Sequence, residues 1–111
     1  MNRKFLSEKQ LLELIHFAYS VGKDISFVVQ GNSMYPLLRH ERTKVVLSQC
    51  KPAEVAEGDI VLASIGKRLV LHRVLSMQIN DICMLKGDAI VEIEQCLKCD
   101  IIGKVTQIID I

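Results

Sequence analysis

The feature that most constrains this fold is a series of short runs rich in Val, Ile and Leu, which fills the chain after Asp24. Turn-forming residues separate the runs, and no helical pattern lies between them. Gly66-Lys67 is typical of a tight hairpin turn. Strands without crossover helices predict a mainly β fold, namely a curled antiparallel sheet or partial barrel. We expect strands over residues 25–29, 43–47, 59–65, 69–77, 82–85 and 101–111.

Before Asp24 the chain has the pattern of one helix, expected over about residues 7–21. Ser7 is a good N-cap, and Gln10 stands where it completes a capping box. Gly22 is a natural stop. An apolar face of this kind favours packing against the sheet over binding a partner. Its members are Leu11, Leu14, Ile15 and Ala18.

The length and composition fit one globular domain over residues 1–111, with the helix first and the β portion from about residue 24. Hydrophobic residues make up 50% of the chain and charged residues 24%. The net charge of +1 and the absence of Trp give no basis for nucleic-acid binding. The sequence does not indicate an oligomeric state.

The first residues do not have the pattern of a secretory leader. Their basic start is followed at once by Glu8, Lys9 and Glu13, so no apolar segment forms. No apolar run approaches the ~18 residues that span a bilayer. We therefore expect a cytoplasmic protein without a membrane anchor and with reduced thiols.

Cys96 and Cys99 have the spacing of a zinc or redox motif. A structural zinc site usually takes two such pairs, and Cys50 and Cys83 do not form a second one. The polar segment 92–100 fits a loop or a distorted strand, and it lacks the strand-then-helix pattern of a redox pair. We expect ordinary thiols, with no metal and no other cofactor.

Three short stretches carry the residues that could perform chemistry. Ser33 follows Gly31-Asn32, a turn that could project its hydroxyl and aim backbone N–H groups at an oxyanion. In a strand, His72 falls on the face opposite Arg73. Asp88 follows a glycine at the end of a strand run. Each also has an ordinary explanation: a surface turn, a buried core histidine and a turn aspartate.

The order and flanks of these stretches resemble the signal peptidase I family, in the archaeal and endoplasmic-reticulum branch that pairs serine with histidine. More distant relatives, the self-cleaving SOS-response repressors, have lysine at the position of His72. Five boxes follow in the family's order across residues 31–105. They are Gly31-Asn32-Ser33-Met34-Tyr35-Pro36, Gly58-Asp59-Ile60-Val61, His72-Arg73-Val74, Lys86-Gly87-Asp88 and Ile102-Gly103-Lys104-Val105.

The resemblance implies a serine endopeptidase that cleaves a peptide or precursor bound as an extended strand. It implies Ser33 as nucleophile, His72 as general base and Asp88 as the acid that orients His72. Asn32 and Met34 would contribute to the oxyanion and substrate site. A compact chain of this type also resembles peptidases that trim ribosomally made, modified peptides.

The chain departs from the family pattern in two respects. The expected lack of a membrane anchor argues against preproteins at a bilayer as substrates. The histidine branch also has a further acidic residue shortly after the Gly-Asp box, and whether Glu92 or Glu94 takes that place stays open. Two alternatives to an enzyme stay open as well: a non-catalytic peptide-binding module on the same fold, and a regulatory partner of another enzyme.

Overall fold

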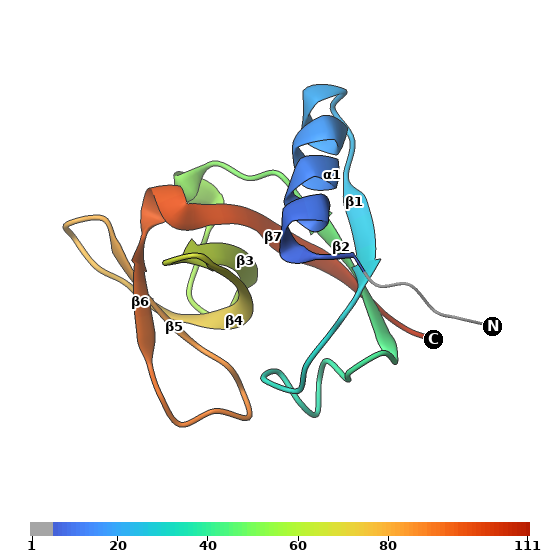
Figure 1. The fold of residues 1–111 in the computed structure, drawn as a ribbon. Helices are drawn as coiled ribbons and strands as arrows, with labels where there is room; N and C mark the ends of the chain where they lie inside the picture. The colour runs from blue at the N-terminus through green and yellow to red at the C-terminus, as the bar shows by residue number, and fades with distance from the viewer. Residues whose placement is uncertain (1–5) are drawn as a thin grey trace.

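The computed structural model describes residues 6–111 (Figure 1). Residues 1–5 lie outside the described residues. The expectation about a leader and the first few residues of the expected domain fall on them. Two short 3-10 turns, Pro52–Glu54 and Lys98–Asp100, follow the second and the sixth strand of the chain. In chain order the elements are α1 (Glu8–Ser20), β1 (Ile25–Val28), β2 (Thr43–Ser48), β3 (Ile60–Ile65), β4 (Arg68–Met77), β5 (Ile82–Lys86), β6 (Glu94–Leu97) and β7 (Ile101–Asp110).

All seven strands form one antiparallel sheet in the order β1-β2-β7-β3-β4-β5-β6. The sheet curls into a half barrel around β3 and β4, so that β1 and β6 form its two edges (Figure 1). β3 and β4 pair from Ile65↔Arg68 outward. In the turn between them Gly66 has a φ of 62°, a conformation that favours glycine. The mainly β fold and this hairpin confirm the sequence expectation.

The helix begins as the capping-box pattern predicts. Ser7 Oγ accepts a hydrogen bond from the Gln10 backbone N–H at 3.1 Å, and the Ser7 N–H donates to Gln10 Oε1 at 2.9 Å. Ile15 is fully buried against Leu47 and Leu62 of the sheet. The helix therefore covers one face of the sheet.

Gly103 of β7 allows this close packing of helix and sheet. A Cβ at this position would lie 2.9 Å from Leu47 Cγ and 2.9 Å from the Ser48 carbonyl oxygen, and would also collide with the Tyr19 hydroxyl. Tyr19 itself donates to the Ile102 carbonyl at 3.2 Å. The outer face of α1 stays open to solvent.

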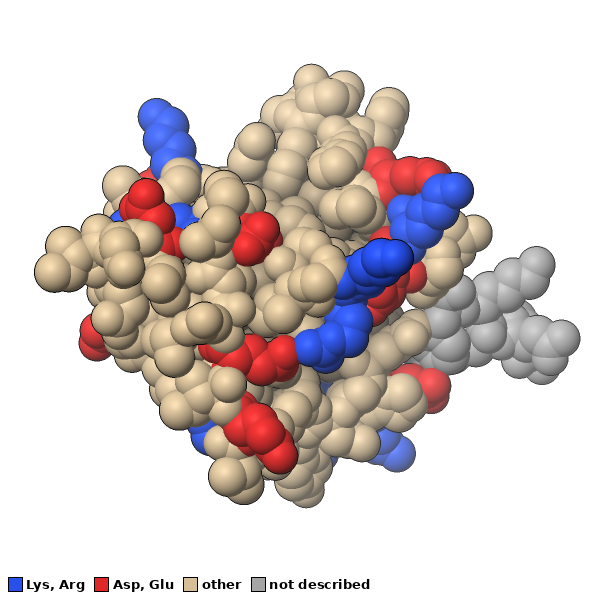
Figure 2. Space-filling view, turned by 60° about the vertical axis from the view of Figure 1, so that its left-hand side comes forward, with Lys and Arg blue, Asp and Glu red and all other residues tan. Residues whose placement is uncertain are grey.

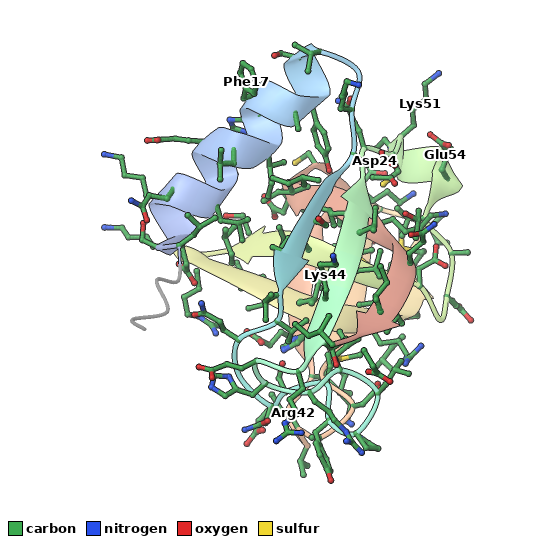
Figure 3. The ribbon with its side chains drawn as sticks, turned by 90° about the vertical axis from the view of Figure 1, so that its right-hand side faces the viewer. Phe17, Asp24, Arg42, Lys44, Lys51 and Glu54 are labelled. Atoms are coloured by element: carbon green, nitrogen blue, oxygen red, sulfur yellow. The ribbon has the colours of Figure 1, made fainter. Side chains whose placement is uncertain are left out.

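β3 is buried on both faces, since Val61 and Ala63 enter one hydrophobic cluster while Ile60 and Leu62 enter two others. On the outer surface, Phe17 points away from the sheet and is 68% exposed (Figure 3). Acidic and basic side chains are interspersed on the face seen in Figure 2. No helix in residues 6–111 is long and apolar enough to cross a membrane.

β6 resolves the polar segment whose pattern fitted either a loop or a distorted strand. It pairs with β5 at the sheet edge, with Cys83↔Cys96 and Leu85↔Glu94 in register. Only Cys96 of this strand is buried. An edge strand with one apolar contact has too weak an alternation to identify from sequence alone.

Candidate functional site

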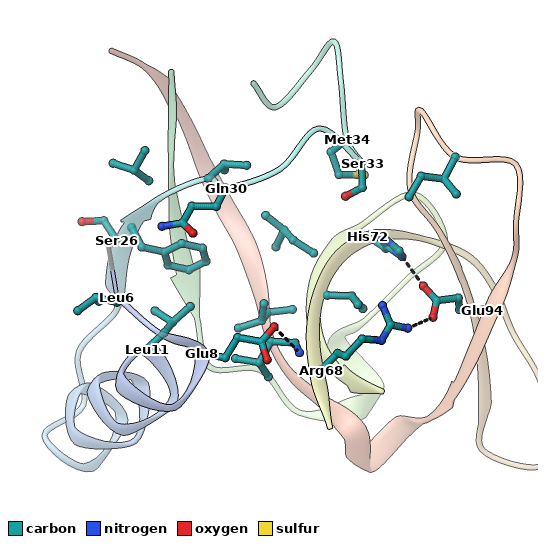
Figure 4. Close-up of a pocket in the computed structure, with 18 residues that line it drawn as sticks. Leu6, Glu8, Leu11, Ser26, Gln30, Ser33, Met34, Arg68, His72 and Glu94 are labelled. Atoms are coloured by element: carbon teal, nitrogen blue, oxygen red, sulfur yellow. Dashed lines mark hydrogen bonds and ion pairs between the residues drawn. The ribbon is translucent and has the colours of Figure 1, made fainter. Parts of the chain in front are cut away.

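A pocket of about 520 Å³ lies between the β1 side of the sheet and the first half of β4 (Figure 4). Residues 26–30 form one wall and residues 68–72 the other. The start of α1 borders one part of the pocket, and the Ser33 hydroxyl faces into another (Figure 4). Most of the lining side chains are apolar, among them Leu11, Phe27, Met34, Leu62, Leu69, Leu71 and Ile90.

Ser33 lies in the turn that follows β1 and is fixed by the segment after β5. The Ala89 N–H donates to the Ser33 carbonyl at 2.9 Å. Gly87 makes this approach possible, because a Cβ there would lie 2.5 Å from the Ser33 carbonyl oxygen and 3.1 Å from Ser33 Cβ. The glycine of the Lys-Gly-Asp box is thus needed for the position of the serine turn.

The neighbours of Ser33 differ in their surroundings. Met34 is 2% exposed, lines the pocket, and its Sδ accepts a hydrogen bond from the Asp88 N–H at 3.3 Å. Asn32 is exposed, does not line the pocket, and its carbonyl accepts from the Tyr35 N–H at 3.1 Å. Of the two residues expected at the oxyanion and substrate site, only Met34 reaches the pocket.

His72 lies on the buried face of β4, between Val70 and Val74 as the alternation predicts. Its side chain lines the same pocket as Ser33. No hydrogen bond joins Ser33 to His72 within residues 6–111, although both side chains face the cavity (Figure 4). Because apo sites often have long catalytic contacts that tighten with substrate, this geometry is compatible with either chemistry or binding.

The Nδ1 atom of His72 is buried and has no hydrogen-bond partner within residues 6–111. Burial lowers the pKa of His72 below the ordinary value of 6.5, and the nearby Arg68 charge lowers it further. The carboxylates of Glu94 and Asp88 act in the opposite direction. The net effect is a lowered pKa, which favours the neutral form of the imidazole.

Asp88 does not make the hydrogen bond to His72 that the sequence led us to expect. Its Oδ1 accepts from Arg73 Nε at 2.9 Å and its Oδ2 from Arg73 Nη2 at 2.8 Å. Arg73 also donates to the Gly58 carbonyl at 2.8 Å. The physical reason is that a guanidinium binds a carboxylate at two points, and strand alternation puts Arg73 on the face opposite His72. This contact lowers the pKa of Asp88.

Glu94 is the acid that faces His72. Its Oε1 lies 3.6 Å from His72 Nδ1, and its Oε2 lies 2.5 Å from Arg68 Nη2 (Figure 4). Glu92, the other acid left open by the sequence, is exposed. Glu94 could have been identified only from the pairing of β6 with β5, and the sequence pattern did not predict that β6 is a strand.

The cysteines do not gather into a metal site. Within residues 6–111, no group of three or more His, Cys, Asp and Glu side chains could hold a metal ion. Cys96 lies opposite Cys83 in the β5–β6 pair, and the four cysteines are free thiols. Burial raises the pKa of Cys96 to about 12, so this thiol is not activated.

A model of the family described as Peptidase S24-like matches residues 6–106. The matched region extends from the residues before α1 into β7, and so includes Ser33, His72 and Glu94. No curated protein and no solved structure matches the chain.

Proposed function

The chain belongs to the Peptidase S24-like family, and on that premise we propose that it is a serine endopeptidase with Ser33 as nucleophile and His72 as general base. The observation that carries the proposal is that these two side chains, from the turn after β1 and from β4, line one pocket. The lowered pKa of His72 supports it, since only neutral imidazole can accept a proton.

We further propose that the site is of the histidine-using, signal peptidase-like type. Lysine is the base in the self-cleaving relatives that the sequence resembles. No lysine lines the pocket within residues 6–111, where the nitrogen bases are Arg68 and His72. Arginine stays protonated in proteins, so His72 is the available base.

The reaction would follow the course of other serine peptidases. His72 Nε2 takes the proton of Ser33 Oγ while that oxygen attacks the carbonyl carbon of the scissile bond. Backbone N–H groups of the turn that holds Ser33 would stabilise the resulting oxyanion. The C–N bond then breaks as His72 gives its proton to the leaving amine. Water, activated by His72 in the same way, releases the acyl group from Ser33.

We assign the orienting role to Glu94 in place of Asp88. The distance of 3.6 Å between Glu94 Oε1 and His72 Nδ1 supports this assignment, because a small rotation would bring the pair within hydrogen-bond reach. Both oxygens of Asp88 are already bound by Arg73. Holding Nδ1–H on Glu94 would leave Nε2 free to serve Ser33.

Asp88 would then act on the nucleophile turn instead. Its N–H contacts Met34 Sδ at 3.3 Å, and the next residue, Ala89, binds the Ser33 carbonyl. Its side chain ties this segment to Arg73 of β4. We infer that Asp88 and Arg73 position the turn that carries Ser33.

The substrate would bind as an extended strand between two unpaired strand edges. β1 is an edge of the sheet, and β4 pairs with β5 only from Arg73 onward. Residues 68–72 therefore have one free side, which faces the pocket. We call the part of the pocket between residues 26–30 and residues 68–72 the slot. A peptide bound in the slot could pair its backbone with either edge and place alternate side chains against the apolar walls.

The test is cleavage of a synthetic library of short unstructured peptides, read by mass spectrometry, together with the intact mass of the chain to detect self-cleavage. Ser33→Ala and His72→Ala should each abolish cleavage. The matched controls Ser20→Ala and His16→Ala, at exposed positions of α1 outside the pocket, should cleave as wild type does. Cleavage that survives Ser33→Ala would overturn the proposal.

A non-catalytic peptide-binding module is the second candidate. The observation that favours it is the missing hydrogen bond between Ser33 and His72 within residues 6–111. In that case library peptides would bind wild type and Ser33→Ala equally, and neither protein would produce fragments.

A further inference from the structure

The pocket has a second polar feature, at the start of α1. Glu8 is the first residue of the helix and lines the slot at a distance from Ser33 (Figure 4). Its Oε1 accepts a hydrogen bond from the Leu69 backbone N–H at 3.3 Å. This contact places the carboxylate of Glu8 at the rim of the pocket, where it stays exposed to solvent.

The partner of Glu8 belongs to the free edge of β4. The Val74 N–H donates to the Asp59 carbonyl on the β3 side at 2.8 Å. Because backbone groups alternate along a strand, the N–H groups of Leu69 and Leu71 point the other way, toward the slot. A bound peptide strand would pair with this edge of β4. The first N–H donor of the edge, that of Leu69, is bound to Glu8.

In the described part of the chain, three charged side chains line the slot, and two of them, Arg68 and Glu94, pair with each other, whereas the third is Glu8. Arg68 and Glu94 form an ion pair beside His72. Glu8 lines the same pocket but has no ion-pair partner within residues 6–111. Among residues 6–111, the α1 end of the pocket therefore presents a carboxylate that has no ion-pair partner and lies beside apolar walls.

We propose that Glu8 determines specificity by binding a cationic group of the substrate: a Lys or Arg side chain, or a free amino terminus. The proposal rests on the function proposed above. Glu8 contacts β4 at Leu69 and the base is His72, a separation of about 10 Å at ~3.3 Å per residue. The cationic group of the substrate would therefore lie about three residues from the cleaved bond.

The experiment uses fluorescein-labelled peptides rich in alanine and leucine, each with one Lys, Gln or Glu at a successive position. Binding to the Ser33→Ala protein is measured by anisotropy, and cleavage by the protein with Ser33 intact is measured in parallel. Peptides with acetylated and free amino termini separate the two sources of positive charge. Glu8→Gln is the test variant. Glu13→Gln is its matched control, an exposed acid of the same helix outside the pocket.

Lys at one position should strengthen binding about two- to fivefold over Gln, the range of a solvent-exposed ion pair. Glu8→Gln should remove that preference, Glu8→Lys should transfer it to the Glu peptide, and Glu13→Gln should leave it unchanged. High salt should weaken it. A Lys preference that persists in Glu8→Gln, or none in the Ser33→Ala protein, would overturn the inference. Absence of cleavage alone would contradict the proposed function, because the binding preference is measured without turnover.

Discussion

The guanidinium of Arg73 binds both carboxylate oxygens of Asp88, at 2.9 and 2.8 Å, on the side of β4 that faces away from His72. The aspartate that the family resemblance assigned to the base instead joins two segments of the chain. Arg73 adds a third through the Gly58 carbonyl. We propose that the orienting role belongs to Glu94, which lies 3.6 Å from His72 Nδ1 on a strand that the sequence pattern did not predict.

Replacing Glu94 should impair catalysis more than binding. Glu94→Gln keeps the size of the side chain but loses its charge, so His72 would no longer be held with Nε2 toward Ser33. We expect kcat to fall about a hundredfold or more with KM nearly unchanged. Steady-state kinetics on a cleaved library peptide measure this. The exposed Glu92→Gln is the matched control, and an equal loss there would contradict the role of Glu94.

Asp88→Asn should have a milder and mainly structural effect. The variant loses the charge-assisted pair with Arg73, whose side chains are 26% and 31% exposed, so the free energy of unfolding should fall by about 1 kcal/mol or less. Cleavage should continue at a reduced rate through a less rigid Ser33 turn. Denaturant unfolding and kinetics on the same samples test both parts. A loss of kcat greater than that of Glu94→Gln would return the orienting role to Asp88.

Cleavage should rise with pH as His72 loses its proton. The pKa of His72 is lowered in the folded protein, mainly by burial, so the midpoint of kcat/KM should lie below 6.5. Glu94 raises this pKa, and Glu94→Gln should therefore move the midpoint to still lower pH. A pH–rate profile checks both shifts, and a midpoint above 6.5 would contradict the account.

The same group makes folding sensitive to acid. Because the folded-state pKa of His72 is depressed, its stabilising contribution is present above the unfolded value of about 6.5 and is lost as pH falls through the folded pKa. His72→Gln should therefore show a smaller loss of stability than wild type below that pH. Thermal unfolding at a series of pH values measures the difference, and parallel curves for the two proteins would exclude it.

Gly87→Ala should disable the site while the chain still folds. The added Cβ would meet the Ser33 carbonyl at 2.5 Å and displace the nucleophile turn. Gly103→Ala is the contrasting variant, since its Cβ meets Tyr19, Leu47 and Ser48, none of which lines the pocket. It should lower the melting temperature but preserve cleavage per folded molecule. Circular dichroism with kinetics separates these outcomes, and normal cleavage by Gly87→Ala would contradict the tight approach.

Local signals made much of this structure predictable. The Ser7–Gln10 capping box and the burial of His72 could both be predicted from residues a few positions away, since His72 alternates in step with Val70 and Val74. Glu94 could not be assigned in this way, because its approach to His72 depends on the β5–β6 register and on Arg68. These are contacts between distant segments, and periodicity carries no information about them.

The interaction partner of Asp88 could not be predicted from the sequence either. Strand alternation put Arg73 on the face opposite His72, and the structure agrees. It did not reveal which of the two neighbouring side chains the turn aspartate would join. A two-point contact with a guanidinium is a stronger attraction than one hydrogen bond to a neutral imidazole, and that difference decided the outcome.

The account depends most on one claim: His72 is an uncharged base whose Nδ1–H is held by Glu94, leaving Nε2 for Ser33. Nitrogen-15 NMR of the imidazole tests it without a substrate, in wild type and in Glu94→Gln, with Glu92→Gln as control. We expect the Nδ1–H tautomer and a pKa below 6.5 in wild type, with a lower pKa and more Nε2–H tautomer in Glu94→Gln. An Nε2–H tautomer in wild type, or a His72 signal that does not respond to Glu94→Gln, would contradict the claim.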